Sequence, residues 1–234
     1  MRIADRTWMQ VEQYLQGDNR CVLPLGSTEQ HAYLSLSVDA ILAEKVAVDA
    51  AEPVGVPVFP AVPYGLTPYF MGFPGTVTLE PATYEQVLRE ILVSLRRHGF
   101  KKVLLVNGHG GNATAWPGLE RWALEEGGLN LRWHDWWKAP KTMAAVQAID
   151  PDASHASWME GFPWTRVGGV DVPTGHKEAV DLSGRDELTP EEFRERIGDG
   201  SFGGDYERPD EELLAIWKIA VEETQEVLTE GWQV

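Results

Sequence analysis

Residues 23–40 read LPLGSTEQHAYLSLSVDA, and this stretch decides the fold of the chain. The apolar run that begins at Cys21 and ends at Gly26 is typical of a strand buried in a parallel sheet. Asp39 begins the run DAILAEKVAVDAAE, whose apolar residues recur at helical spacing. The stretch therefore predicts a strand, a polar loop and a helix, which is how an α/β unit begins.

The same alternation continues along the chain. The run KKVLLVNGHGGN (101–112) is typical of a strand that ends in a glycine-rich loop. The pattern also predicts helices over about 81–98, 112–126 and 210–230, a strand over 129–137, a proline-broken extended run at 56–65, and irregular structure over 138–209. We therefore expect a single α/β domain, residues 1–234, with a largely parallel sheet.

Composition excludes several classes of partner. The net charge of −16 argues against nucleic acid and against an anionic membrane surface, both of which favour basic proteins. The single cysteine, Cys21, excludes a disulfide framework and is expected in the core. No apolar leader or membrane-spanning run is visible, so the cytoplasm is the expected location.

Four side chains that could bind a metal follow the first two strands of this pattern. Glu29 and His31 are two residues apart in an extended loop, so they can face the same cavity. Asp39 lies at the expected start of a helix, and His109 is flanked by glycines. This donor set suits Zn²⁺, Mn²⁺ or Fe²⁺. Each residue alone also has an ordinary structural interpretation, such as a helix cap for Asp39, and spacing leaves both interpretations open.

Other catalytic motifs are missing from the sequence. The chain contains neither GxGxxG nor GxxxxGK[ST], so only the glycines of NGHGGN favour a nucleotide site. It also lacks the GxSxG motif of a serine nucleophile.

The motifs LPLGSTEQH, an aspartate that opens a helix, FPGT and VNGHGGN occur in an order that resembles the creatininase (creatinine amidohydrolase) family. This resemblance implies a three-layer α/β/α sandwich, a homo-oligomer that is often a hexamer, and a hydrolase centre with two divalent metal ions. Zinc and manganese, singly or together, are the expected ions, with iron as the alternative.

The resemblance also assigns roles to residues. It implies that Glu29 and His109 bind one ion, that His31 binds the second, and that Asp39 bridges both. In SHASWMEGF (154–162), it implies that His155 is the catalytic histidine and that Glu160 binds the second ion. Such a centre activates a water between the ions, and the histidine transfers a proton to the leaving group.

Three departures from the family pattern put creatinine itself in doubt as the substrate. The loop from His31 to Asp39 is one residue short, and Gly111 and Trp158 occupy positions where members of the family carry acids. A cyclic amide or guanidine, a formamide and a cyclic sugar ketone of the inosose type all stay open as substrates. The expected pocket residues are Trp136, Trp137, Trp158, Arg166 and His176. A non-catalytic member that binds metal or a small molecule is the alternative from another class.

Overall fold

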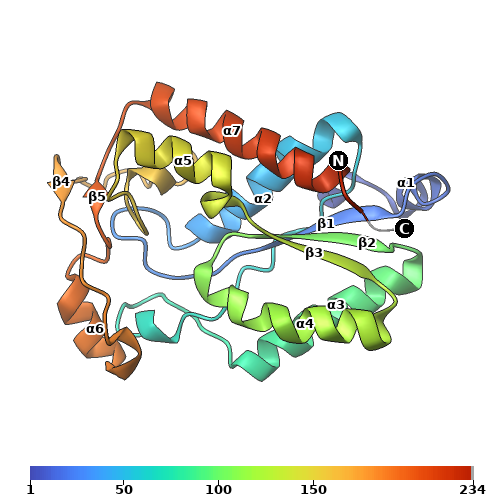
Figure 1. Ribbon diagram of the computed structural model, residues 1–234, viewed down its shortest axis with the longest axis horizontal. Helices are drawn as coiled ribbons and strands as arrows, with labels where there is room; N and C mark the ends of the chain where they lie inside the picture. Colours follow the sequence, from blue (N-terminus) through green and yellow to red (C-terminus); the bar gives the residue numbers. More distant parts are fainter. Residues whose placement is uncertain (233–234) are drawn as a thin grey trace.

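In the computed structural model, which describes residues 1–232, three parallel strands form the central sheet (Figure 1). The strands are β1 (Arg20–Leu25), β2 (Lys102–Asn107) and β3 (Asn130–Asp135), in the order β1-β2-β3. The extended run that contains Val58 and Val62 lies beside β1 and pairs with it only at isolated bridges. Its prolines lack the N–H groups that a continuous ladder needs, which confines it to the edge of the sheet.

Helices cover both faces of this sheet (Figure 1). Helices α2 (Val38–Ala51), α5 (Pro140–Ile149) and α7 (Asp210–Thr229) lie on one face, and α3 (Pro81–His98) and α4 (Trp116–Trp122) lie on the other. Alternate strand residues enter different cores: Val22, Leu104 and Val106 pack with α2 and α7, while Cys21, Leu23, Val103 and Leu105 pack with α3 and α4. The three-layer α/β/α sandwich is confirmed.

The helix predicted after β2 differs from its sequence prediction. The helix expected at 112–126 is divided into a 3₁₀ helix (Gly110–Ala115), α4 and a π-helix (Ala123–Gly127). Pro117 lies in the first turn of α4, where a missing N–H costs little, so the chain restarts its helix there.

The prediction of irregular structure over 138–209 is wrong for α5 and for α6 (Pro190–Ile197). Both helices begin with a proline, which breaks a helix in its interior but suits its first turn. Thr189 also forms a capping box with Glu192, whose Oε2 accepts the Thr189 N–H at 2.8 Å.

Short elements complete the structure. Helix α1 (Trp8–Tyr14) precedes β1, and the antiparallel strands β4 (His176–Lys177) and β5 (Gly204–Asp205) lie near α6 (Figure 1). The 3₁₀ turns are Ile3–Asp5, Glu52–Val54, Pro68–Phe70, Trp136–Lys138, Trp158–Glu160 and Arg185–Glu187. Among residues 1–232, no helix is both long enough and apolar enough to cross a membrane.

Candidate metal centre

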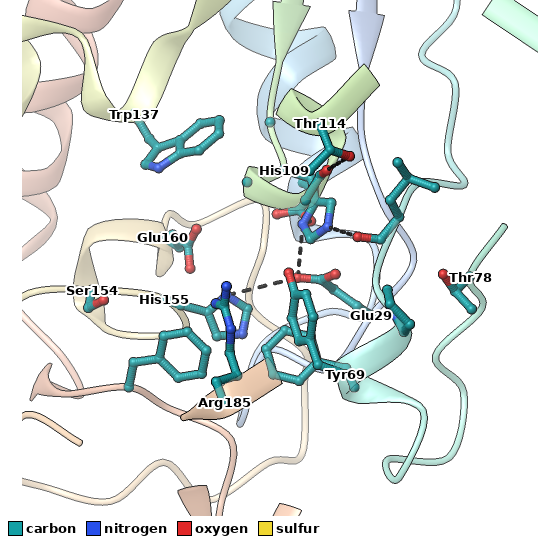
Figure 2. Close-up of a pocket in the computed structure, with 18 of the residues that line it drawn as sticks. Glu29, Tyr69, Thr78, His109, Thr114, Trp137, Ser154, His155, Glu160 and Arg185 are labelled. Carbon is teal, nitrogen blue, oxygen red and sulfur yellow. Dashed lines mark hydrogen bonds and ion pairs between the residues drawn. The ribbon is translucent and has the colours of Figure 1, made fainter. Parts of the chain in front are cut away.

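Five predicted ligands come together beyond the carboxyl ends of β1 and β2, where ligands bind in parallel sheets. Figure 2 labels Glu29, His109 and Glu160 among them. The loop after β1 carries Glu29 and His31, the first turn of α2 carries Asp39, and the residue His109 follows β2. Glu160 lies far from them in sequence, in the 3₁₀ turn Trp158–Glu160. All five are buried, with exposed fractions of 1% to 7%.

The five side chains form two groups that share Asp39. In the first group, His109 Nδ1 lies 3.2 Å from Glu29 Oε1 and 3.2 Å from Asp39 Oδ2. In the second, His31 Nε2 lies 3.1 Å from Asp39 Oδ1 and 3.9 Å from Glu160 Oε2. Each oxygen of Asp39 therefore faces a different histidine, as a carboxylate that bridges two cations would.

Backbone carbonyls set which nitrogen of each imidazole faces the centre. His109 Nε2 donates to the carbonyl of Leu66 at 2.9 Å, and His31 Nδ1 donates to the carbonyl of Glu29 at 3.2 Å. The other nitrogen of each ring then carries a lone pair toward the carboxylates. A second hydrogen bond of this kind is typical of histidines that bind metals, because it fixes both tautomer and orientation.

Hydrogen bonds also fix the carboxylates of Glu29 and Glu160, each of which belongs to only one of the two groups. Ser27 Oγ donates to Glu29 Oε2 at 3.1 Å, and the Ala156 N–H donates to Glu160 Oε2 at 2.6 Å. Ala156 has a φ of +59°, a left-handed conformation that is strained for alanine. The strained residue is therefore the same one whose N–H donates to Glu160 and orients its carboxylate.

The electrostatics of the centre favour cations. Burial disfavours an imidazolium at His31, but the Asp39 carboxylate outweighs it and raises the pKa of His31 to about 10. Burial likewise opposes charge at His109, yet Glu29 and Asp39 raise its pKa. Burial raises the pKa of Glu160 to about 7. Without a metal ion, the carboxylates draw protons onto the two imidazoles, so the centre attracts positive charge.

Two buried atoms show that the residues fit metal ions. When His31 and His109 carry their protons on the carbonyl-facing nitrogens, His31 Nε2 and Asp39 Oδ2 are inaccessible to solvent and have no hydrogen-bond partner among residues 1–232, which is costly unless another group binds them. Each group offers two carboxylate oxygens and one imidazole nitrogen, with ligand atoms within 4.8 Å of one another. Three such protein ligands with an open position are the usual set of a catalytic zinc site.

The space around Gly111 is too small for the acidic side chain that members of the family carry at this position. A Cβ atom there would lie 2.0 Å from the carbonyl oxygen of Leu66 and 2.6 Å from His109 Nε2. The Leu66 carbonyl that orients His109 occupies the space that a side chain would need. The first group therefore offers three candidate protein ligands, Glu29, Asp39 and His109.

His155 lies beside both groups. Its ring is 4.4 Å from that of His31 between centroids, and its Nδ1 is 3.9 Å from Glu29 Oε1. Burial and the neighbouring His31 hold the pKa of His155 well below its ordinary value, so this imidazole is neutral. A neutral histidine at this place is able to hold or transfer a proton.

A cavity of about 880 Å³ opens from the centre (Figure 2). Glu29, Asp39, His109, His155 and Glu160 form part of its wall. Its other walls include residues that sequence reasoning missed: Tyr69, Thr78, Thr114, Ser154 and Arg185. The Arg185 guanidinium lies 5.1 Å from the centroid of the Tyr69 ring. These residues come from separate 3₁₀ segments and loops and follow no spacing that the sequence could reveal.

Of the five predicted pocket residues, the structure brings Trp137 to the cavity and places the other four elsewhere. Trp136 and Trp158 are buried in the core on the α2 side of the sheet, where burying their large rings is favourable. Arg166 pairs with Asp210, and the exposed His176 lies between Asp152 and Asp205. These four residues do not line this cavity, and a contact between them and the substrate stays a prediction.

Asn107 and Asn112, which flank the histidine loop, support its backbone rather than its ring. Asn107 Nδ2 donates to the His109 carbonyl at 2.6 Å, and Asn112 Nδ2 donates to the Gly26 carbonyl at 3.0 Å. The two asparagines thereby hold together the loops that carry the ligands.

The α/β sandwich and the buried cluster of carboxylates and imidazoles at the carboxyl edge of its sheet make this chain a candidate metalloprotein. The family described as creatininase, creatinine amidohydrolase, matches residues 4–228, and the chain belongs to this family.

Curated relatives match over part of their length. A creatinine amidohydrolase from Pseudomonas putida is 33% identical over 114 residues, 46% of this chain and 44% of the relative. A mycofactocin precursor peptide peptidase from Mycolicibacterium smegmatis is 40% identical over 101 residues, 40% of each chain. A 3-dehydro-scyllo-inosose hydrolase from Thermotoga maritima is 31% identical over 106 residues, 44% of this chain and 34% of the relative. The chain thus spans less than half the length of the curated relatives it matches.

Solved structures agree over the whole chain. A manganese creatininase superposes with a TM-score of 0.78 at 22% identity, covering 100% of this chain and 99% of the other. A zinc–zinc form of a creatininase mutant gives 0.78 at 21% identity, with 100% and 98% coverage. At this identity the likeness establishes the fold.

Proposed function

We propose that the chain is a hydrolase with a binuclear metal centre that cleaves an amide-like bond or opens a ring in a small polar metabolite. One observation carries the proposal: the two oxygens of buried Asp39 face two separate sets of donors. The relatives are named as an amidohydrolase, a peptidase and a ring hydrolase, which supports hydrolysis as the shared reaction.

Glu29, His109 and Asp39 would hold one ion, and His31, Glu160 and Asp39 the other. Zinc and manganese are the ions we propose, since they suit mixed carboxylate and imidazole ligands and since the creatininase structures are described as manganese and zinc forms. Two such ions supply an activated water and polarise the carbonyl that it attacks.

The protein contributes hydrogen bonding and orientation. Neutral His155 lines the cavity beside Glu29 and Glu160, so we propose that its ring N–H donates a hydrogen bond to the leaving group. The aromatic faces of Tyr69, Phe70 and Trp137 shield the reacting atoms from bulk water.

Substrate class is the finer part of the proposal. The cavity wall combines those aromatic faces with the hydroxyls of Thr78 and Thr114 and with the cation of Arg185, a mixture that suits a polar metabolite with an anionic group. A cyclic amide is our first choice, and a formamide or an inosose-type sugar ketone is the alternative within the same family.

The test is turnover by protein loaded with Zn²⁺ or Mn²⁺ against creatinine, a carboxylate-bearing cyclic amide, an N-formylated amine, a cyclic sugar ketone and a short peptide. We expect His155→Asn to abolish hydrolysis and the matched variant His98→Asn, on an exposed residue at the end of α3, to keep it. Bound metal without turnover of any of these substrates would favour the non-catalytic alternative.

The family resemblance also leads us to propose a homo-oligomer, with a hexamer as the first candidate. Light scattering of the purified chain distinguishes this assembly from a monomer.

A further inference from the structure

Gln30 lies between two proposed metal ligands in sequence, yet its side chain belongs to a different set of contacts. The residue is 5% exposed, and its amide contacts the loop around Gly200 and the ring of His155. None of the roles assigned so far explains a buried amide at this position.

Two backbone groups fix which way this amide points. The Ala32 N–H donates to Gln30 Oε1 at 3.0 Å, and Gln30 Nε2 donates to the Gly200 carbonyl at 3.0 Å. An N–H can only donate and a carbonyl can only accept, so exchanging the amide oxygen and nitrogen would break both bonds. Ala32 adopts a φ of +49°, a strained conformation for alanine.

The fixed amide in turn fixes the tautomer of His155. Gln30 Nε2 lies 2.9 Å from His155 Nε2 and has one hydrogen left after its bond to Gly200. A hydrogen bond between these nitrogens requires a lone pair on His155 Nε2. In a neutral imidazole the proton is then on Nδ1, the nitrogen that faces Glu29 Oε1 at 3.9 Å.

Aromatic neighbours keep the His155 ring in this orientation. Phe70 stacks on it at 4.8 Å between centroids with an interplanar angle of 23°, and the Phe202 ring lies at 4.7 Å. Rotating the imidazole to exchange its nitrogens would also lose the Gln30 contact.

Gly200 is needed for the amide to fit. Its φ is +105°, and a Cβ atom built there would lie 1.8 Å from Gln30 Oε1. The loop GDGSFGG (198–204), which contains Gly200, thus approaches Gln30 so closely that any side chain at position 200 would displace the amide.

We propose that Gln30 is a positioning residue that holds the His155 proton on Nδ1, facing the metal centre, so that the neutral imidazole donates a hydrogen bond from Nδ1 to the leaving group of the substrate. This inference rests on the proposed hydrolase function. Its structural part, the tautomer, is independent of turnover.

The experiment is ¹⁵N NMR of the imidazoles in histidine-labelled protein, metal-free and loaded with Zn²⁺, because protonated and unprotonated ring nitrogens have distinct shifts. The chain has six histidines, and His155→Asn identifies the signal. We expect the proton on Nδ1 in the wild type. In Gln30→Glu the carboxylate can only accept, so we expect the proton on Nε2. For the best substrate, we expect kcat about 100-fold lower with KM and metal content little changed.

Thr76→Val is the matched control. Thr76 Oγ1 accepts the backbone N–H of Gln30 at 3.2 Å, so this variant loses a buried bond to the same residue and leaves the amide in place. We expect the wild-type tautomer and kcat. Gly200→Ala provides a second route, since it displaces the amide without changing Gln30. In this variant, too, the His155 proton should no longer be held on Nδ1.

A wild-type proton on Nε2 would overturn the proposal. So would Gln30→Glu and Gly200→Ala proteins that keep the Nδ1 proton and the wild-type kcat. If no substrate is turned over while the tautomer responds as expected, the proposed function fails and the tautomer assignment stands.

Discussion

The proposed binding of two ions depends most on Asp39, because its oxygens lie 3.1 Å from His31 Nε2 and 3.2 Å from His109 Nδ1. Asp39→Asn removes the charge from both donor groups, whereas Glu160→Gln alters one. We expect about two ions per chain in the wild type, about one in Glu160→Gln and fewer than one in Asp39→Asn.

The stability effect follows from binding linkage. An ion at 100 times its Kd stabilises the folded state by about 2.7 kcal/mol, so two contribute about 5 kcal/mol. For a chain of 234 residues, 1 kcal/mol corresponds to about 2–4 °C in Tm. Chelation should therefore lower the wild-type Tm by about 10–20 °C, that of Glu160→Gln by about half as much, and that of Asp39→Asn by almost nothing.

The assays are elemental analysis and calorimetry with and without chelator, each variant being compared with its own metal-free form. Asp49→Asn is the matched control, since it removes a partly exposed carboxylate from the same helix, where Asp49 pairs with Lys45, and leaves an amide oxygen that can still accept the Trp217 indole N–H. This control should bind as many ions as the wild type and show the full shift. An Asp39→Asn protein with wild-type metal content and an undiminished shift would refute the shared-ligand argument.

Three further predictions concern stability, each measured by denaturant unfolding. Gly111→Ala should cost about 1–3 kcal/mol and lose metal, because its Cβ would meet the Leu66 carbonyl; Gly110→Ala, with open space around its Cβ, should match the wild type. Burial lowers the pKa of the His134 imidazole from 6.5 to about 4. Between these pH values only the unfolded chain binds a proton at His134, so the free energy of unfolding falls as the pH falls. The loss should reach about 3 kcal/mol relative to His134→Gln, and equal pH profiles would contradict it. Ala32→Gly should be nearly neutral because it relieves a φ of +49°, whereas Ala215→Gly, exposed in α7, should cost about 1 kcal/mol; equal costs would refute the strain at Ala32.

Local signals determined the elements that the sequence predicted well. Helix α3 spans Pro81–His98 as predicted, because a proline suits its first turn and Gly99, with a φ of +112°, ends it. The strands β1 and β2 follow from short apolar runs that end at glycine-containing loops. These signals depend on neighbouring residues alone, so a single sequence contains them.

Residues close together in the sequence also predicted part of the candidate centre. Glu29, His31 and Asp39 lie within eleven residues of one another, at the end of a predicted strand and the start of a predicted helix. The parallel register of β1 and β2, in which Leu25 pairs with Asn107, brings His109 to the same edge of the sheet. The α/β pattern predicted the parallel orientation of these strands, since crossover connections make such strands parallel, and the structure gives their register.

Packing between distant segments decided the rest. Glu160 reaches His31 only because a 3₁₀ turn folds against the sheet and Ala156 donates to its carboxylate, and Leu66 orients His109 from another loop. The same packing drew Trp136 and Trp158 into the core instead of the pocket. The sequence by itself therefore determined the layers of the fold and most of the candidate ligands. The cavity wall, the Gln30–His155 contact and the exclusion of a side chain at Gly111 arise from atoms that meet only in the folded chain.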